Sequence, residues 1–253
     1  MKPPRVVLVT KRFPLGEYLQ RRLAEAGFLV GTVFEHRSRL ATLRRIAKRQ
    51  GWVRAADVLA FGAYDRIFRG AQFRSAVAAK LGVRGHLPAL PEYDAASANA
   101  PEAREFIGSL RPEVIVVHAT GLLQPDTFQL APLAVNLHCG ILPEYRGHDT
   151  LFWALARADE DHLGSTIHVI DSGADTGAVL RHCLVRREPG DTDITIWIRA
   201  FVAGVDGLLD VLDGPFPEGR RPAGKRYEPW QHRGLFDHLR YLRVSRRRWS
   251  RPK

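Results

Sequence analysis

Cysteine is scarce in this sequence, which has only Cys139 and Cys183 among its 253 residues. The two are not spaced as a Cys-x-x-Cys pair, so the sequence offers neither a disulfide framework nor a cysteine zinc site. No stretch approaches the roughly 18 consecutive apolar residues of a membrane-spanning helix. The apolar run after the first five residues is too short for a secretory signal. We therefore expect a soluble, cytoplasmic protein.

Acidic residues are also few, with 27 Asp and Glu against 38 Lys and Arg, a net charge of +11. Such a balance attracts anionic small molecules, nucleic acid or an acidic membrane surface without choosing between them. The G-x-G-x-x-G and P-loop patterns of nucleotide-binding proteins are absent. A hydrophobic content of 45% excludes a disordered chain, and the length suits one α/β domain with a small appendage.

The N-terminal third begins with a pattern typical of a parallel sheet. Residues 6–10 and 28–34 are apolar and rich in β-branched side chains, which predicts two strands. Between them Pro14 can start a helix, three leucines recur every four residues, and Gly27 stands where a C-cap glycine belongs. Two strands joined by a helix form a right-handed βαβ unit.

Further elements follow the same logic. The run 114–117 is continuous and β-branched, as in a central strand buried on both faces. Shorter strands are predicted at 134–138 and 165–171, and helices at 102–110, 149–158 and 193–212. The last of these helices has a cap at 190–192 and ends before Gly214 and Pro215. The predicted fold is α/β, with a Rossmann-like, mostly parallel sheet flanked by helices.

Two regions carry most of the basic residues. Residues 38–81 have a helical pattern, which we interpret as a pair of amphipathic helices covering one sheet face. A basic patch for phosphates or a lipid surface remains the alternative.

Residues 85–98 predict a loop with at most a short strand. We divide the chain into a catalytic domain, 1–214, and a short Arg-rich extension, 215–253, in which Trp230, Tyr241 and Trp249 can dock while the arginines form a mobile end.

Asn136 and His138 lie two residues apart at the end of a predicted strand, so their side chains project to one face. Open α/β sheets bind their ligands at the carboxyl ends of parallel strands. A lone Asn-x-His pair is weak evidence of chemistry. It gains weight from Pro143, from Tyr145-Arg146-Gly147, and from the turn Asp171-Ser172-Gly173-Ala174-Asp175-Thr176-Gly177.

With these motifs the sequence resembles the folate-dependent formyltransferases, a family that includes enzymes acting on methionyl-tRNA, glycinamide ribonucleotide and amino sugars. The resemblance covers residues 112–180 strongly and the first 35 residues weakly. It implies the formyltransferase fold and a formyl transfer from 10-formyltetrahydrofolate to a primary amine, without a metal. It also assigns the catalytic roles to Asn136, His138 and Asp175.

The chemistry of these side chains is consistent with the resemblance. When an amine attacks a formyl carbon, negative charge develops on the formyl oxygen, and fixed donors lower the barrier. The Asn136 amide and a protonated His138 can supply them. A carboxylate at Asp175 favours the imidazolium and can receive the proton that the amine releases.

The resemblance also implies binding residues. The folate is expected between the loop after strand 114–117 and the acidic turn, in contact with Thr120, Gly121, Leu122, Leu123, Phe128, Asp171, Gly173 and Ala174. For Asp171, capping its own turn is the alternative, and His118 and His168 are expected to be packed or hydrogen-bonded nearby. Lys11, Arg12 and Arg146 are candidate contacts for an anionic acceptor, although Arg146 can instead hold its loop through carbonyls.

The acceptor is the least determined part of the prediction. The segment 10–16 departs from the phosphate loop of the ribonucleotide enzymes, and the segment after 214 is short for the C-terminal domain of the tRNA enzymes. A small anionic amine remains, for which an amino-sugar nucleotide is our first expectation and an amino-acid or hydroxylamine metabolite the alternative. We do not expect nucleic acid as a partner, and a homodimer is compatible with this reading.

A different class of function also fits part of the sequence. A Rossmann-like module that binds nucleotides or nucleic acid without catalysis would use the arginines on phosphates. It would leave the set of Asn136, His138 and Asp175 unexplained. Salt-dependent RNA binding without folate affinity would favour this alternative.

Overall fold

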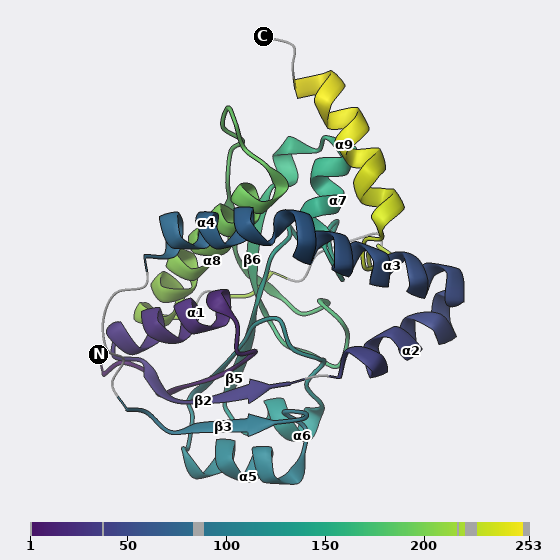
Figure 1. Ribbon diagram of the computed structural model, residues 1–253. Coiled ribbons are helices and arrows are strands. Elements are labelled where there is room, and N and C mark those ends of the chain that lie inside the picture. The colour runs from purple at the N-terminus through teal and green to yellow at the C-terminus, as the bar shows by residue number, and fades with distance from the viewer. Residues whose placement is uncertain (1, 37, 83–88, 217, 221–226, 250–253) are drawn as a thin grey trace.

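A computed structural model describes the chain from residue 2 to residue 249, except for residues 37, 83–88, 217 and 221–226. Its centre is a seven-stranded sheet in the order β3-β2-β1-β4-β5-β6-β7 (Figure 1). The strands are β1 (Val6–Thr10), β2 (Leu29–Glu35), β3 (Glu92–Ala95), β4 (Val114–Val117), β5 (Leu133–His138), β6 (Gly164–Val169) and β7 (Val179–Leu184).

Helices connect and cover these strands. They are α1 (Pro14–Glu25), α2 (Arg39–Gln50), α3 (Trp52–Tyr64), the π-helix η1 (Asp65–Arg69), α4 (Gly70–Leu81), α5 (Pro101–Ser109), α6 (Pro125–Phe128), α7 (Thr150–Arg157), the short 3-10 helix η2 (Glu160–His162), α8 (Asp193–Asp213) and α9 (Leu235–Trp249). The Thr192 side chain caps α8 in a reciprocal capping box with Thr195, at the site where the sequence predicts a cap. None of the described helices is long and apolar enough to cross a membrane.

The sheet is mostly parallel, as predicted. Strands β1 to β5 pair in parallel, whereas β6 pairs antiparallel with β5 and β7 antiparallel with β6. Strand β7 was not predicted. It is an edge strand whose residues are half-buried or exposed, so it lacks the apolar run or alternation that marks a buried strand. The predicted loop at 85–98 contains β3, while its first four residues lie outside the described part of the chain.

Two apolar layers enclose the sheet. On one face, α1 and α8 pack their leucines and Phe201 against Val6, Leu8, Val135 and Leu137. On the opposite face, α5 packs against the alternate residues of the same central strands, including Val7 and Val9. Because strand residues alternate between faces, Asn136 and His138 project to the α5 side of the sheet, away from α8.

The basic segment after β2 differs from the predicted pair of sheet-covering helices. It forms a helical arm, residues 39–81, of α2, α3, η1 and α4, and among these helices α4 packs on α8. Figure 1 shows α2 and α3 extending beyond the sheet. Trp52 and Val53 are 74% and 83% exposed, so this part of the arm does not bury its apolar residues against the sheet. The periodicity of the segment indicated helices but could not indicate what they pack against.

The C-terminal segment packs on the domain. Tyr241 is buried in an apolar cluster with residues of α7 and α8, and Trp230 packs against the same cluster. The predicted mobile arginine end is in part a helix, because α9 extends to Trp249. One face of α9, with Leu235, His238, Tyr241 and Leu242, is at least half-buried, which explains why the helix folds against the domain. The Trp249 side chain and residues 250–253 lie outside the described part.

Candidate active site

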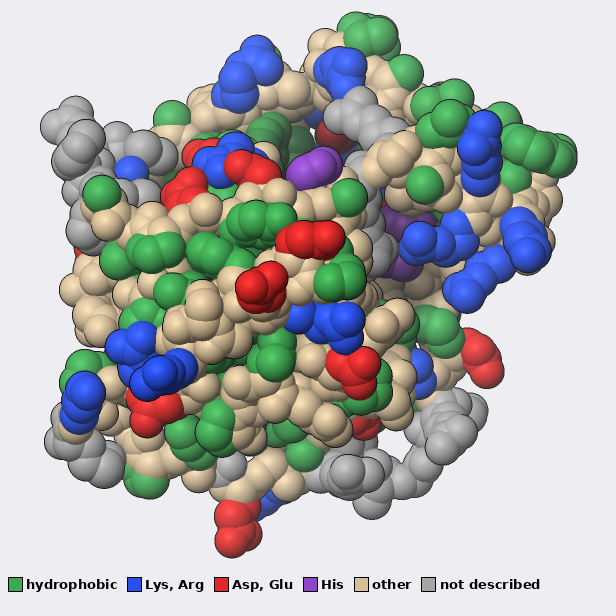
Figure 2. Space-filling model, turned by 90° about the horizontal axis from the view of Figure 1, so that it is seen from below, with side chains coloured by type: hydrophobic (Ala, Val, Ile, Leu, Met, Phe, Trp, Pro, Cys, Tyr) green, Lys and Arg blue, Asp and Glu red, His purple; other side chains and the backbone are tan. Residues whose placement is uncertain are grey.

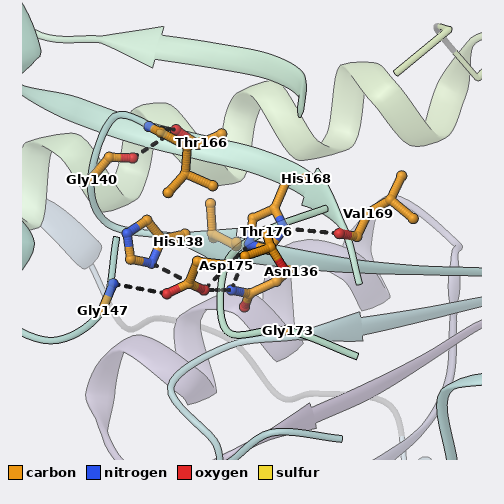
Figure 3. Close-up of polar contacts among 12 residues, drawn as sticks. Asn136, His138, Gly140, Gly147, Thr166, His168, Val169, Gly173, Asp175 and Thr176 are labelled. Carbon is orange, nitrogen blue, oxygen red and sulfur yellow. Dashed lines mark hydrogen bonds and ion pairs between the residues drawn. The ribbon is translucent and has the colours of Figure 1, made fainter. Parts of the chain in front are cut away.

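Strand β5 presents Asn136 and His138 on one face, as the alternation of the sequence predicts. Val135 and Leu137 are buried toward α8, while Asn136 and His138 contact Asp175 from the opposite side. Figure 3 shows the three side chains converging, with the Asp175 carboxylate in contact with both of the others. The structure thus brings together the three residues that the sequence singled out.

The Asp175 carboxylate is contacted by Asn136, by the His138 and His168 rings and by the Gly147 amide. Its Oδ1 accepts a hydrogen bond from Asn136 Nδ2 (3.3 Å) and lies 3.8 Å from His138 Nδ1. Its Oδ2 accepts a hydrogen bond from the backbone N–H of Gly147 (2.9 Å). Asp175 itself adopts a left-handed backbone conformation, with φ of 52°, which Asp tolerates better than most residues. The turn is therefore shaped to aim one carboxylate into the site.

Burial and charge act on Asp175 in opposite directions. Burial raises its pKa, but the neighbouring His138 and His168 rings and the Gly147 amide lower it by more, so the pKa is well below its ordinary value. The group is an anion at neutral pH. A carboxylate with so low a pKa is a weak base, and an efficient proton acceptor has a pKa near the working pH. The geometry thus favours stabilisation of a charged His138 over proton abstraction by Asp175.

A backbone carbonyl fixes the orientation of His138. Its Nε2–H donates to the carbonyl oxygen of Tyr145 (2.8 Å), which leaves Nδ1 directed at Asp175. When the ring is protonated, the proton on Nδ1 lies between the ring and the carboxylate. Tyr145 is in turn held by a hydrogen bond from its hydroxyl to Asp159 (2.8 Å) and by stacking on Trp230. The loop after β5 therefore selects the tautomer of the neutral ring.

Asn136 uses its amide hydrogens within the site. One is directed at Asp175, and the other at Nε2 of His168, 3.0 Å away. The Nδ1–H of His168 donates to the Val169 carbonyl (2.9 Å), which leaves Nε2 facing Asn136. Donation from Asn136 to an oxygen of a substrate would require one of these two bonds to open. In this structure Asn136 orients the carboxylate.

His118 is a packed residue, in line with the sequence interpretation. It is buried beside Phe13 and Phe201, and its Nδ1 donates to the carbonyl of Leu137 (2.9 Å). Burial lowers its pKa to about 4, so it is neutral at physiological pH. It supports the back of β5 without adding a charge to the site.

The loop after β4 contains the first group of predicted folate contacts. Leu122 is 59% exposed, whereas Leu123 is buried and Phe128 packs against the same apolar cluster. The Leu122 carbonyl accepts a hydrogen bond from the Asn99 side chain (2.9 Å). Thr120 bonds the carbonyl of Gly121 through its hydroxyl (3.0 Å). The loop is thus fixed by its backbone and exposes one aliphatic side chain.

The acidic turn contains the second group. Asp171 caps its own turn, since its Oδ1 accepts from the Gly173 amide (3.0 Å) and from the Thr176 hydroxyl (2.6 Å). The turn fits closely against β6, and a Cβ on Gly177 would lie 1.8 Å from the carbonyl oxygen of Val169. Any other residue at Gly177 would displace the turn that carries Asp175. Ala174 is half-buried beside Asp175.

The predicted anion contacts already have protein partners. Arg12 forms ion pairs with Glu92 and Asp94, both at 3.2 Å, and its guanidinium lies over the Phe34 ring. Lys11, next to it, is half-buried and also has an interaction partner. Arg146 donates to the Tyr227 carbonyl (3.3 Å), as in its loop-holding interpretation. An anion at Arg12 would compete with two carboxylates.

The described residues include no group of three or more His, Cys, Asp or Glu side chains arranged to hold a metal ion. The titratable groups of the site are instead within reach of one another, with Asp175 between the histidines at 3.8 Å and 3.5 Å from their nearest nitrogens.

Three groups of the site were not identified from the sequence. They are the Gly147 amide, the Tyr145 carbonyl and the buried carboxylate of Glu35. The first two are backbone groups, which carry no side-chain signal. Glu35, at the end of β2, accepts hydrogen bonds from the amides of Gly121 (3.0 Å) and Ala98 (3.1 Å). The sequence signal for Glu35 was its position as an acidic residue at the end of an otherwise apolar strand.

We expect Glu35→Gln to loosen the predicted folate loop. The substituted amide cannot accept both backbone N–H groups, because one of its ends is a donor, so a buried N–H loses its partner at a cost of about 1–3 kcal/mol. Urea unfolding will measure the loss of stability, and titration with tetrahydrofolate the loss of affinity. Glu102→Gln, on the exposed start of α5, is the control. Unchanged stability and affinity would show that Glu35 does not hold this loop.

Comparison with known proteins agrees with this architecture. A sequence model described as formyl transferase matches residues 47–212. Methionyl-tRNA formyltransferases from Desulfotalea psychrophila and Burkholderia orbicola are 32% and 33% identical over 127 and 133 residues, about half of this chain. The matched segments span only 39% and 40% of those two proteins.

Solved structures extend the likeness to the fold of nearly the whole chain. A sugar N-formyltransferase from a Shewanella species matches with a TM-score of 0.56 and 16% identity over 95% of this chain and 87% of its own. Phosphoribosylglycinamide formyltransferase from Streptococcus pneumoniae matches with a TM-score of 0.54 and 19% identity over 83% of this chain and 97% of its own. The family model covers more than half of the chain, and the chain belongs to the formyl transferase family.

Proposed function

We propose that this protein transfers a formyl group from 10-formyltetrahydrofolate to a primary amine, and that Asn136, His138 and Asp175 carry out the transfer. The observation that carries the proposal is the convergence of these three side chains and the Gly147 amide on one face of β5. The carboxylate aligned with an imidazole is suited to a reaction in which negative charge develops on an oxygen.

The residues around this centre fit a folate. The loop after β4 exposes Leu122, an aliphatic side chain suited to a flat ring system, and the turn 171–177 provides a second wall close to Asn136. When bound, 10-formyltetrahydrofolate supplies an activated formyl group. Thr120, Gly121 and Leu123 on the first wall, and Asp171, Gly173 and Ala174 on the second, are the proposed contacts.

The charged form of His138 is central to the proposed chemistry. In formyl transfer to an amine, negative charge develops on the formyl oxygen, and the nitrogen that attacks acquires a proton to lose. His138, held by the Tyr145 carbonyl and paired with Asp175, keeps a positive ring next to that oxygen. Asn136 holds Asp175 in place and can turn one amide hydrogen to the substrate. Because Asp175 is a weak base, we assign the proton that the amine releases to solvent water rather than to this carboxylate. As the bond between the formyl carbon and the folate nitrogen breaks, that nitrogen takes up a proton from water.

For the acceptor we propose a small, anionic amine, first of all an amino-sugar nucleotide. Solved structures that share this fold include a sugar N-formyltransferase and a ribonucleotide enzyme, which cover 95% and 91% of this chain, so the choice between these acceptors rests on the segment that would bind the ribonucleotide phosphate. The segment 10–16, in which Arg12 is bound by Glu92 and Asp94, lacks the small residues expected of a ribonucleotide phosphate loop. Amino-acid and hydroxylamine metabolites are the second class to test.

The proposed function is tested by incubating the protein with 10-formyltetrahydrofolate and a panel of amines. The panel contains amino-sugar nucleotides, glycinamide ribonucleotide, amino acids and hydroxylamines. We expect tetrahydrofolate release and a formamide product with an amino-sugar nucleotide, and neither with the His138→Ala variant. Near-normal turnover by that variant would refute the proposed site. Release with none of the amines, together with no binding of tetrahydrofolate, would refute the proposed function.

A further inference from the structure

The positive charge of this chain is concentrated on a few helices. Residues 39–81 carry ten Lys and Arg and two Asp, and α9 carries five Arg and one Asp. The remainder of the chain has 23 Lys and Arg against 24 Asp and Glu, and is nearly neutral. The excess is therefore a local property of the helical arm and of α9, which contact each other through α3.

The two acids of the arm are both engaged. Asp57 is buried and paired with Arg54, and Asp65 is paired with Arg69. Four cations of α2, namely Arg44, Arg45, Lys48 and Arg49, are all exposed. The arm thus presents basic side chains to solvent with almost no acidic side chain among them. Figure 2 shows Lys and Arg side chains beside hydrophobic ones at the right of the molecule, where α2 and α3 lie.

The same helices expose large apolar side chains. Trp52 is 74% exposed, Leu59 58% and Ile67 71%. Their spacing of seven and eight residues places them on one face of the continuous helix formed by α3 and η1. Val53 and Phe68, at 83% and 70%, flank this row. Folded proteins seldom expose such a contiguous apolar row unless it meets a partner.

We propose that this arm surface, made of Arg44, Arg45, Lys48, Arg49, Trp52, Val53, Leu59, Ile67 and Phe68, docks the protein on an anionic phospholipid bilayer. Interfacial helices combine an apolar face, which enters the boundary between headgroups and acyl chains, with Lys and Arg that meet anionic headgroups. Trp side chains are enriched at that boundary.

Charge distinguishes this partner from the others. A second copy of the chain would bring two strongly basic surfaces together and would be repelled. Nucleic acid would satisfy the arginines, but it would leave Leu59 and Ile67 of the apolar row in water, because phosphates and base edges bind polar groups. An anionic bilayer satisfies both parts of the surface.

The arm surface adjoins the rim of the candidate active site. Gln50, at the end of α2, donates to Gln231 (2.6 Å), and the neighbouring Trp230 bonds the Arg146 carbonyl next to Gly147. A cavity of about 580 Å³ lies between these segments, lined among others by Arg54, Glu144 and Trp153. Docking would therefore bring the site close to the bilayer. The proposal is independent of which amine is formylated.

Vesicle co-sedimentation of the full chain tests the proposal. One set of vesicles is phosphatidylcholine alone, and the other contains equal parts of phosphatidylcholine and phosphatidylglycerol. We expect binding to the anionic vesicles only. The triple variant Arg44→Gln, Arg45→Gln, Arg49→Gln should lose about 100-fold in affinity, since each charge near the surface contributes about fivefold. The variant Trp52→Ser, Leu59→Ser, Ile67→Ser should lose at least as much.

Matched controls use exposed residues elsewhere. Lys2→Gln, Arg111→Gln and Arg186→Gln remove three exposed charges, and Leu184→Ser removes a leucine that is 62% exposed. These should bind as the natural protein does, and circular dichroism melting will establish that every variant is folded.

Three results would overturn the proposal. The first is no preference for anionic vesicles, or equal losses in the controls. The second is RNA binding that exceeds vesicle binding and is weakened by the charge variant but not by the apolar one. The third is a dimer in sedimentation velocity that the apolar variant dissociates, without vesicle binding.

Discussion

The Asp175→Asn substitution should reduce the rate of formyl transfer by at least about 100-fold, the effect typical of removing one electrostatic group from such a centre. The substituted amide has nearly the shape of the carboxylate but no charge, so a protonated His138 loses its partner. One end of the substituted amide is itself a donor, so either Asn136 or the Gly147 amide loses its acceptor. The rate of tetrahydrofolate release at saturating amine measures the effect.

The matched control for this substitution is Asp210→Asn. The Asp210 side chain is 61% exposed on α8 and forms an ion pair with Arg181, so its loss should leave the rate within about twofold.

The pH profile separates an electrostatic role of Asp175 from a general-base role. The pKa of Asp175 is well below its ordinary value, so the group stays ionised through the neutral range and above about pH 4. A general base that is already ionised would therefore give a constant rate ratio between natural protein and variant across that range. Loss of the carboxylate that favours the protonated His138 lets the ring of the variant release its proton at lower pH, so we expect the ratio to rise as the pH increases through neutrality. A constant ratio, or a loss of less than tenfold, would contradict the assignment.

The sequence predicted best those helices and strands that are determined by the pattern of their own residues. The β-branched runs of β1 and β4 and the leucine repeat of α1 each carry their own periodicity, and each forms the expected element. Alternation along β5 likewise predicts that Asn136 and His138 share a face. Asp175, 37 residues beyond His138, could be connected with them only through the family motif, because no local rule relates a turn to a distant strand.

The features that the sequence did not predict depend on contacts with segments far away in the chain. The reversal of β6 and the exposed edge strand β7 have no apolar signature of their own. The amphipathic pattern of residues 38–81 indicated helices, yet it could not show that Trp52 faces solvent. The C-terminal segment shows the opposite case, because it is ordered where the sequence predicted mobility. Its arginines suggested a mobile end, while Tyr241 and His238 anchor α9 against α7.

The second large effect concerns a buried ion network that joins three distant segments. Asp193, at the start of α8, accepts hydrogen bonds from Arg69 of η1 and from Arg233 before α9, both at 2.7 Å. All three side chains are at most 15% exposed. Burial raises the pKa of Asp193, but the two guanidinium groups, Arg233 first, lower it below its ordinary value. The network thus holds the helical arm and the C-terminal segment on α8.

Removing Asp193 leaves two guanidinium groups buried without their shared anion. Breaking a buried ion pair by deleting one partner costs about 3–5 kcal/mol, because the charge that remains is uncompensated. We expect Asp193→Ala to lower the free energy of unfolding by this amount in urea titrations. Asp206→Ala, which removes a 56% exposed partner of Arg22 from the same helix, should cost no more than about 1 kcal/mol.

The pH dependence and a double substitution test whether the charge itself is responsible. A depressed carboxyl pKa contributes stability that is complete above the unfolded value of about 3.9 and is lost as the pH falls through the folded value. The difference in the free energy of unfolding between the natural protein and Asp193→Ala should therefore be constant from pH 8 to about pH 5 and shrink only in acid.

Combining Asp193→Ala with Arg69→Leu removes one of the two cations that have lost their shared anion, and it should recover part of the lost stability. If the double variant is instead less stable than Asp193→Ala by the full cost of Arg69→Leu alone, the two residues act independently, and the arm is held by its apolar contacts rather than by this network.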